Sequence, residues 1–450
     1  MVQITFLTLY LGLTLGVQPI EVTVTGETAV AAVEIVLDGA PIGRLEGPPW
    51  RGQIDFGPAL LPHLLAARAL DAEDRELGTT AQWVNLPRPP AEVDVLLENG
   101  PAGRPVSARL TWQSLTGEQP SALGVTFDDR PLIPESDGRI ALPPWDPATS
   151  HVLTVELRFS GALTARRDVV FGGPFGDEVA TELTAVPVRP RPEQKLPAPE
   201  QMKGWLRAGG LPVTVAAVEE GPADLVVVHD LALRNRLNGI LAGATRTRPT
   251  LNMRGATLGE QNSELRRYEM TLKEDGKVVM VWPIPRTIDQ PGTDVELFST
   301  SRPFDRHDGG ILWFLARFFP TGDGPERQRL ADAVAVAGLQ ALRANHRRAV
   351  LLVLSENPLD RSHSSPALVR RYLESIRVPL YVWTLGDPAA PAVAAWGDAE
   401  PVSTLGKMSK AFRRLKKDLD DQRLLWVDGR HLPQTLELTP AAAAVVESVR

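Results

Sequence analysis

Residues 224–230 read Asp-Leu-Val-Val-Val-His-Asp, an apolar run that ends on the carboxylate of Asp230. A short run rich in valine predicts a buried β-strand, and the residues after Asp230 are expected to begin a helix. Ligands of an open α/β sheet bind beyond the carboxyl ends of its parallel strands. Asp230 is therefore expected at the end of a sheet where a ligand would bind.

Strand-like and helix-like segments alternate around this run. Further apolar runs predict strands at 212–218, 278–282, 295–298, 349–354 and 380–385. Apolar residues at helical spacing predict helices at 327–344, 366–376 and 405–419. Ser365 and Pro366 are a typical start signal for the second of these helices. The alternation predicts an α/β Rossmann-like domain with a mostly parallel sheet and helices on both faces.

Two earlier segments resemble copies of one β module. Asp38 and Asp128 each follow a strand-like run, with an offset of 90 (128 minus 38), and His63 and His151 each begin one, with an offset of 88 (151 minus 63). A repeat of this length with short strands and Asp/Gly/Pro turns is typical of immunoglobulin-like sandwiches, although chance similarity is the alternative. We expect the two histidines to be packing or turn residues rather than paired metal ligands.

The prolines in residues 186–199 predict a semi-rigid linker between the β modules and the α/β region. The expected organisation is a possible signal peptide or first strand at 1–19, β-sandwiches at 20–90 and 91–185, the linker at 186–201, the α/β domain at 202–390 and a C-terminal helix–strand extension at 391–450. The extension would contain strands at 424–427 and 435–438.

Composition limits the class of protein. The chain has 450 residues, 43% of them hydrophobic, and a formal net charge of -7, which indicates several globular domains and argues against nucleic-acid binding. It contains no cysteine, which excludes disulfides and thiolate metal sites. Residues 1–17 carry no charge and are either a secretory signal without its basic start or a first strand. The secretory alternative predicts a periplasmic or secreted protein with at most an N-terminal membrane anchor.

The region from about Leu211 to Gly386 resembles a von Willebrand factor A domain, in particular the VWFA-related domains of bacterial exported proteins. The resemblance depends on the order and spacing of the strand ending at Asp230, Glu296-Leu-Phe-Ser-Thr-Ser301, the helix containing residues 330–334, residues 349–355 and residues 378–386. It implies a divalent cation at the top of the sheet, held by oxygens from three loops. Asp230 matches the first aspartate of the family's Asp-x-Ser-x-Ser motif.

The remaining ligand positions of that motif are altered in this chain. Ala232 and Arg234 replace the two serines, Thr321 lies near the family's threonine, and Glu356 replaces the strand-end aspartate. A hard cation such as Mg²⁺ needs near-octahedral oxygen ligands, which alanine and arginine do not provide. We therefore expect a degenerate site without a cofactor. If Mg²⁺ or Mn²⁺ did bind, its ligands would be Asp230, Thr321 and Glu356, whereas without a cation Asp230 would serve as a helix N-cap.

The expected function is non-catalytic recognition or scaffolding of another protein. The candidate partner-binding residues are Asp230, Arg234, Ser299, Thr300, Thr321 and Glu356. Arg234 would supply a positive charge for a partner carboxylate in place of the cation. The partner itself has no signature in the sequence.

Two other functions stay open. One is a hydrolase that uses the same crevice, since Ser355, Asp360 and His363 cluster in the sequence; however, no Gly-x-Ser-x-Gly elbow, phosphate-binding glycine loop or His-Glu-x-x-His motif occurs. We therefore assign no catalytic residue. The other is a structural component of the cell envelope. The basic segment 407–417 is expected to be a solvated helix face, with an anionic membrane or acidic partner as the alternative.

Overall fold

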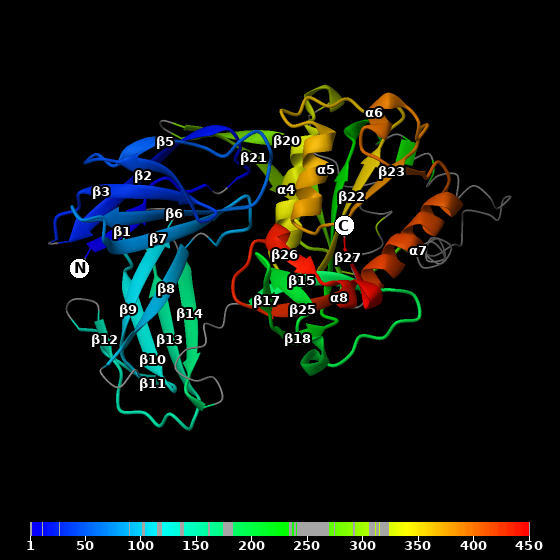
Figure 1. The fold of residues 1–450 in the computed structure, drawn as a ribbon. Helices are drawn as coiled ribbons and strands as arrows, with labels where there is room; N and C mark the ends of the chain where they lie inside the picture. Colours follow the sequence, from blue (N-terminus) through cyan, green and yellow to red (C-terminus); the bar gives the residue numbers. More distant parts are fainter. Residues whose placement is uncertain are drawn as a thin grey trace, which may run out of the picture. The chain divides into compact units, whose positions relative to one another are not determined.

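The computed structural model divides into two compact units, which are shown in Figure 1. The first contains residues 1–58, 63–184 and 428–430, and the second contains residues 59–62, 185–427 and 431–450. The structure describes residues 2–10, 12–26, 28–89, 91–100, 104–114, 119–135, 139–160, 163–173, 183–233, 236–237, 240, 270–273, 275–290, 293–305, 311, 315 and 324–449.

The first unit contains two consecutive β-sandwiches with the same strand order. The first sandwich pairs a sheet of order β1-β2-β5 with one of order β4-β3-β6-β7, and the second pairs β8-β9-β12 with β11-β10-β13-β14. The strands of the first are β1 (Val2–Phe6), β2 (Val17–Gly26), β3 (Ala32–Leu37), β4 (Ala40–Leu45), β5 (Arg51–Asp55), β6 (His63–Leu70) and β7 (Glu76–Val84). Those of the second are β8 (Ala91–Asn99), β9 (Pro105–Ser114), β10 (Ala122–Phe127), β11 (Arg130–Pro131), β12 (Arg139–Ala141), β13 (His151–Arg158) and β14 (Thr164–Phe171). The matching order confirms two immunoglobulin-like sandwiches in tandem.

The N-terminal segment belongs to the first sandwich. Strand β1 pairs antiparallel with β2, and Val2, Ile4 and Phe6 are buried in the core between the two sheets. Alternate side chains of a strand point to one face, so this spacing fits a half-buried strand. The sequence allowed either a signal peptide or a first strand here, and the structure shows a first strand. The expected boundary at residue 20 was therefore wrong, because β1 and β2 begin before it.

A turn with an aspartate and a histidine occurs at the same place in both sandwiches. Asp38 and Asp128 have φ angles of 52° and 47°. The Nδ1 atoms of His63 and His151 lie 2.7 and 2.6 Å from the Oδ2 atoms of Asp38 and Asp128, respectively. The other oxygen of each aspartate accepts the amide that follows the histidine, at 2.8 and 2.9 Å. Each histidine is the first residue of its strand, β6 or β13, and holds the neighbouring aspartate turn, which agrees with the expected packing or turn role.

The second unit contains a six-stranded sheet of order β21-β20-β19-β22-β23-β24. Its strands are β19 (Ala223–His229), β20 (Lys277–Gln290), β21 (Thr293–Thr300), β22 (Arg347–Leu354), β23 (Leu380–Thr384) and β24 (Ala399–Pro401). Four pairings are parallel, and only the edge strand β21 pairs antiparallel, with β20. The carboxyl ends of β19, β22 and β23 therefore lie at the same edge of the sheet.

Helices pack against both faces of this sheet. Helices α4 (Leu330–Leu342) and α5 (Pro366–Ser375) contact each other, and α4 lies against β19, β20 and β22. Helix α7 (Leu405–Asp421) covers the other face with Met408 and Phe412, and α6 (Pro391–Ala394) is a single turn. Ser365 accepts the amide of Leu368 at 3.2 Å, which confirms the predicted cap of α5. Within the described residues, no helix is long and apolar enough to span a membrane.

Two smaller sheets complete the second unit, with orders β18-β25-β15-β27 and β17-β16-β26. Their strands are β15 (Leu183–Pro190), β16 (Leu206–Ala208), β17 (Leu211–Val213), β18 (Val215–Glu219), β25 (Arg423–Asp428), β26 (Leu436–Leu438) and β27 (Val446–Ser448). The short helices η3 (Pro199–Met202), η7 (Pro433–Thr435) and α8 (Pro440–Val445) connect them. The larger α/β sheet is thus inserted between β18 and β25.

This arrangement corrects two expected boundaries. Residues expected to form a linker supply β15, whose Val186 and Val188 are buried in a core shared with β25 and β26. The expected C-terminal extension is also part of the second unit, since α7 covers the sheet and β25, β26 and β27 join the smaller sheets. Burial of alternate valines stabilises β15 despite its prolines, because apolar surface is removed from water along one face.

Candidate functional site

Asp230 directly follows β19 and is fully buried. Its Oδ1 accepts hydrogen bonds from the Ala232 amide at 2.9 Å and from Gln328 Nε2 at 2.8 Å. Its Oδ2 accepts the Ser355 amide at 3.2 Å and the Ser355 hydroxyl. An ionised carboxylate offers about four acceptor positions, and neutral donors of the chain occupy all four. Asp230 therefore ties the end of β19 to the end of β22 and caps the short helix η4 (Leu231–Leu233).

Gln328 completes this buried cluster and was missed by the sequence reasoning. Its side chain is buried; Nε2 also donates to the Leu359 carbonyl at 2.7 Å, while Oε1 accepts the Leu231 amide at 3.0 Å. The residue lies 98 positions from Asp230, and no local pattern distinguishes it from an ordinary polar residue. Gln328 thus joins η4, the start of α4 and the loop that follows β22.

The loop after β22 is tied to the first turn of α4 by two carboxylates. Asp360 accepts the first two amides of α4 at 2.9 and 3.1 Å, and so caps the helix from a distant segment. Asp332 accepts the amides of His363 and Ser364 at 3.0 and 3.1 Å. Burial raises the pKa of Asp332, but the hydrogen bonds from His363 and Arg329 outweigh this effect and lower it below the usual value.

Arg329 connects the same loop to the edge of the sheet. Its Nε donates to Asp332 at 2.7 Å, its Nη1 pairs with Glu296 on β21, and its Nη2 lies 3.1 Å from His363 Nδ1. Burial lowers the pKa of Arg329, whereas its two carboxylate partners raise it, and the net direction is upward. A guanidinium only donates, so His363 Nδ1 accepts this bond.

The hydrolase alternative requires a serine hydroxyl beside a base. Ser355 instead donates its hydroxyl to Asp230, and His363 is held by Arg329. In the part of the chain that the structure describes, no histidine lies within hydrogen-bond distance of Ser355. The three residues that cluster in the sequence are thus held by different partners, and they form no nucleophile–base pair.

The other predicted binding residues do not join the Asp230 cluster. Glu356 is exposed and pairs with Arg236. Thr300 is opposite Val281 on β20, so Ser299 and Thr300 lie two strands away from β19, roughly 10 Å at ordinary strand spacing. Arg234 and Thr321 lie outside the described residues. The structure therefore unites Asp230 with Ser355 and Gln328, and leaves Glu356, Ser299 and Thr300 apart.

The described donors do not fit a divalent cation. Asp230 already uses its four acceptor positions, and Ala232 has no side-chain oxygen. Over the described residues, no group of three or more histidine, aspartate or glutamate side chains is placed to share an ion. Mg²⁺ and Mn²⁺ prefer six oxygen ligands, and the described residues around Asp230 do not by themselves supply such a set.

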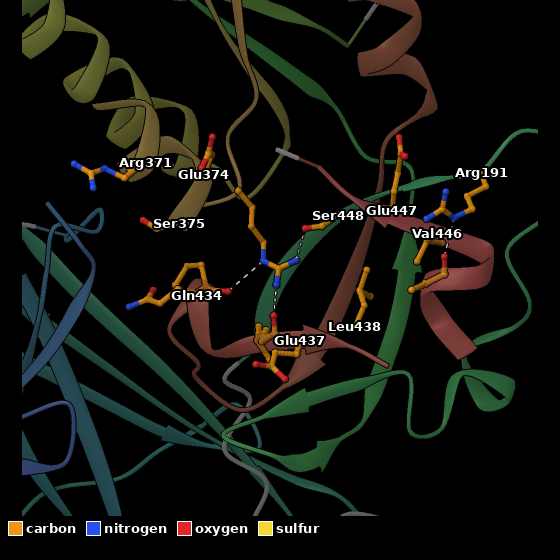
Figure 2. Close-up of a pocket in the computed structure, with 14 residues that line it drawn as sticks. Arg191, Arg371, Glu374, Ser375, Gln434, Glu437, Leu438, Val446, Glu447 and Ser448 are labelled. Atoms are coloured by element: carbon orange, nitrogen blue, oxygen red, sulfur yellow. Dashed lines mark hydrogen bonds between the residues drawn. The ribbon is translucent and has the colours of Figure 1, made fainter. Parts of the chain in front are cut away.

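A second candidate site is a cavity of about 880 Å³ near the amino ends of the parallel strands, shown in Figure 2. Arg377 crosses it: Nε donates to the Pro433 carbonyl at 3.1 Å, Nη1 to the Ser448 hydroxyl at 2.8 Å, and Nη2 to the Leu436 carbonyl. Charges of both signs line its walls: Arg191, Arg371, Glu374, Glu437 and Glu447. The sequence reasoning singled out none of these residues, because they come from four separate segments.

Comparison with known proteins does not identify the chain. No family model matches it, and no curated protein matches it. Solved structures similar to parts of it include fibronectin(III)-like modules of Clostridium thermocellum CbhA (15% identity, 18% of this chain and 93% of that chain, TM-score 0.17) and the central fibronectin-III array of RIM-binding protein (13% identity, 45% and 81%, TM-score 0.25). A β-glycosidase from Bacteroides vulgatus shares 12% identity over 38% of this chain and 24% of that chain, with a TM-score of 0.17. Such low scores carry no argument, so the immunoglobulin-like assignment depends on strand order.

Proposed function

We propose that this chain is a non-catalytic protein-recognition or scaffolding protein whose α/β sheet is a von Willebrand A-related domain without a functional cation site. The observation that carries the proposal is the saturation of Asp230 by four neutral donors. A carboxylate that joins three segments through buried hydrogen bonds is a structural tie. Recruiting it as a ligand would leave buried donors without acceptors, at a cost of about 1–3 kcal/mol each.

The strand order supports the von Willebrand A part of the proposal. Numbered from β19, the sheet has the order 3-2-1-4-5-6, which is that of doubly wound α/β folds. Helices cover both faces, and Asp230 lies at the carboxyl end of the first strand, where the resemblance places the motif. This topology supports a relationship of fold, while the altered residues support the loss of the cation.

The binding face proposed for a partner is the carboxyl end of the sheet around Leu359. The Leu359 side chain is 53% exposed, yet its carbonyl is fixed by Gln328 at 2.7 Å. The Arg236–Glu356 ion pair, exposed on both sides, lies at the same end. An apolar side chain on a fixed loop loses little conformational freedom when a partner covers it, which favours binding.

A metal titration tests the loss of the cation site. Mg²⁺ and Mn²⁺ are titrated by calorimetry into the full chain and into the Asp230→Ala variant. We expect no saturable heat in either protein at micromolar concentrations. Micromolar binding in the natural chain that disappears in Asp230→Ala would show a live site and overturn the proposal. Ser355→Ala and His363→Ala variants in a broad hydrolase screen test the enzyme alternative, for which we expect no turnover in the natural chain.

Site-specific cross-linking tests the binding face. A photoreactive amino acid is placed at Leu359, and in a matched control at Leu211, which is 72% exposed on β17. We expect one discrete protein adduct from the Leu359 position in extracts of the native cells, and none from Leu211. Equal labelling at both positions, or none at Leu359, would contradict recognition at this face.

Export to the periplasm or medium is a further part of the proposal. Its support is the uncharged stretch 1–17, but removal of residues 1–19 would also remove β1, with its buried Val2, Ile4 and Phe6. Mass spectrometry of the mature N-terminus, combined with cell fractionation, tests this part. An intact N-terminus in the cytoplasmic fraction would contradict export and leave the recognition proposal unaffected.

A further inference from the structure

Two strand edges that have no further partner strand among the described residues line the cavity of Figure 2. Strand β27 is the last strand in the order β18-β25-β15-β27, and β26 is the last in the order β17-β16-β26. Leu436 and Leu438 of β26 and Val446 and Ser448 of β27 all lie on the wall of the cavity. Edge strands present backbone groups that can pair with another chain.

The register shows which backbone groups of β27 face the cavity. The Arg191 amide donates to the Val445 carbonyl at 2.8 Å, and Arg189 is opposite Glu447. In an antiparallel ladder, residues that exchange hydrogen bonds alternate with residues whose N–H and C=O point away from the partner strand. The backbone N–H and C=O groups of Val446 and Ser448 therefore point away from β15. The Val446 amide is already bonded to the Ala442 carbonyl, which leaves the Ser448 amide and carbonyl and the Val446 carbonyl at the free edge.

Strand β26 also directs backbone groups into the cavity. The Thr439 amide donates to the Trp205 carbonyl at 2.9 Å, so Glu437 is the residue that exchanges bonds with β16. The backbone N–H and C=O groups of Leu436 and Leu438 then point away from β16. Arg377 supports this placement, because its guanidinium donates to the Leu436 carbonyl from the cavity side. Arg377 thus makes with β26 the contact that a neighbouring strand would make.

We infer that this cavity is a docking slot for an extended polypeptide segment of another protein, which would add as a strand along the free edge of β27. The occupant is a peptide because alternating N–H and C=O groups at a strand edge are best matched by another main chain. The walls carry arginines and glutamates together, which suits a segment of mixed charge better than a compact anion or cation. The apolar lining comes from both strands, with Leu436 and Leu438 on β26 and Val446 on β27, and it alternates with the charged residues.

This inference shares the recognition role of the proposed function but concerns another face. Arg377 lies three residues before the start of β23, so the slot is at the amino ends of the parallel strands, whereas Asp230 and Leu359 lie at the carboxyl ends. One chain would then have two separate binding faces. The two proposals can fail independently, provided that each face is tested with its own variants.

The test uses phage-displayed random decapeptides selected on the full chain. Selected peptides are then measured by fluorescence anisotropy against the natural chain and against Ser448→Pro, Ser448→Ala and Leu359→Asp variants. Ser448→Pro removes the edge amide without removing a bond to β15, whereas Ser448→Ala keeps that amide and removes only the hydroxyl. We expect Ser448→Pro to weaken peptide binding by about tenfold or more, because one main-chain hydrogen bond is lost. Ser448→Ala should change the affinity by less than about threefold.

Hydrogen exchange on the natural chain provides a second measurement that needs no variant. Bound peptide should slow exchange of the Ser448 amide and leave the amide of Glu447, already bonded within the sheet, unchanged. Peptides that bind Ser448→Pro as tightly as the natural chain, or that do not protect Ser448, would overturn the slot. Binding lost only in Leu359→Asp would also overturn it, while supporting the face given under the proposed function.

Discussion

The Gln328 side-chain amide lies 2.8 Å from Asp230 Oδ1, and this contact joins two residues that are 98 positions apart. The same amide group also holds the Leu359 carbonyl, so a single side chain aligns the end of β19, the start of α4 and the loop after β22. Such a buried polar network is stable only when every member has a partner. The architecture of this end of the sheet is therefore sensitive to the loss of its central acceptor.

Replacing Asp230 with alanine should destabilise the second unit. The variant leaves the Ser355 hydroxyl and amide and the Gln328 side chain buried without their acceptor, for a combined cost on the order of 3 kcal/mol. Urea unfolding of the full chain measures this loss. Glu356→Ala is the matched control, because its carboxylate is exposed and surface ion pairs contribute only about 0–1 kcal/mol. Equal stability of the two variants would refute the structural role of Asp230.

Gly386 and Gly406 should respond to alanine in opposite directions. A Cβ at Gly386 would lie 2.5 Å from the Glu356 Cα, a backbone atom that cannot move aside, whereas nothing lies within 4 Å of a Cβ at Gly406 in α7. We expect Gly386→Ala to destabilise the protein by about 1–3 kcal/mol. Gly406→Ala should stabilise it by up to about 0.5 kcal/mol, because Gly406 lies in the first turn of α7 and alanine loses less backbone entropy in a helix than glycine. Thermal melting shows the sign of each change, and a higher melting temperature for Gly386→Ala would contradict the close approach.

Local patterns in the sequence predicted the elements whose stability is local. The valine run before Asp230 gives β19, the Ser365-Pro366 signal starts α5, and the aspartate–histidine pair of the first sandwich recurs in the second. The predictions failed where distant segments decide. The prolines in 186–190 predicted a linker, but β15 is a strand because it pairs with β25 and β27, which are distant in the sequence. The strand predicted at 435–438 is present as β26. By contrast, the role of Gln328, strand β27 and the exposed edges of β26 and β27 have no local signal, because they exist only after the chain has folded.

The His151–Asp128 pair should make the second sandwich more stable below neutral pH than above it. Burial lowers the pKa of His151, but hydrogen bonds to Asp128 and to the Asp146 carbonyl outweigh it and raise the pKa above 6.5. Because the pKa of His151 is higher in the folded chain than in the unfolded chain, its contribution to stability is complete below the unfolded-state pKa. That contribution is lost as the pH rises through the folded-state pKa. Burial raises the pKa of Asp128, but the hydrogen bond from His151 outweighs this effect and the net pKa is lowered. The contribution of Asp128 to stability is therefore lost as the pH falls through its folded-state pKa.

The expected window of stabilisation therefore extends from roughly pH 4 to roughly pH 6.5. The side chains are partly solvated, so the effect should be on the order of 0.5–1 kcal/mol. Hydrogen exchange is measured in β13 peptides of the natural chain and of the His151→Gln variant. Comparing the two proteins at the same pH removes the intrinsic pH dependence of exchange. The ratio between the two proteins should shrink between about pH 5.5 and about pH 8.5. A ratio independent of pH would exclude a charged histidine at this turn.

The consecutive residues Arg347 and Arg348 of β22 should tolerate methionine very differently, although both are buried. Their side chains point to opposite faces of the sheet, as alternation requires. Arg347 donates to the Gly221 carbonyl at 2.7 and 3.0 Å and to the Leu419 carbonyl at the end of α7 at 3.2 Å. Arg348 has no hydrogen-bond partner for Nη1 within the described structure. Burial, and secondarily the charge of Arg377, lowers the pKa of Arg348 to about 9, so it stays charged at neutral pH.

Arg347→Met should therefore cost about 2–4 kcal/mol, because it leaves buried carbonyls at the end of α7 without donors. Arg348→Met should be neutral or stabilising, since a flexible apolar side chain replaces a buried charge that lacks full compensation. Urea unfolding of the two variants under one set of conditions gives the comparison, with sequence neighbours as controls for each other. If Arg348→Met were as destabilising as Arg347→Met, the assignment of Arg348 as an incompletely compensated buried charge would be wrong.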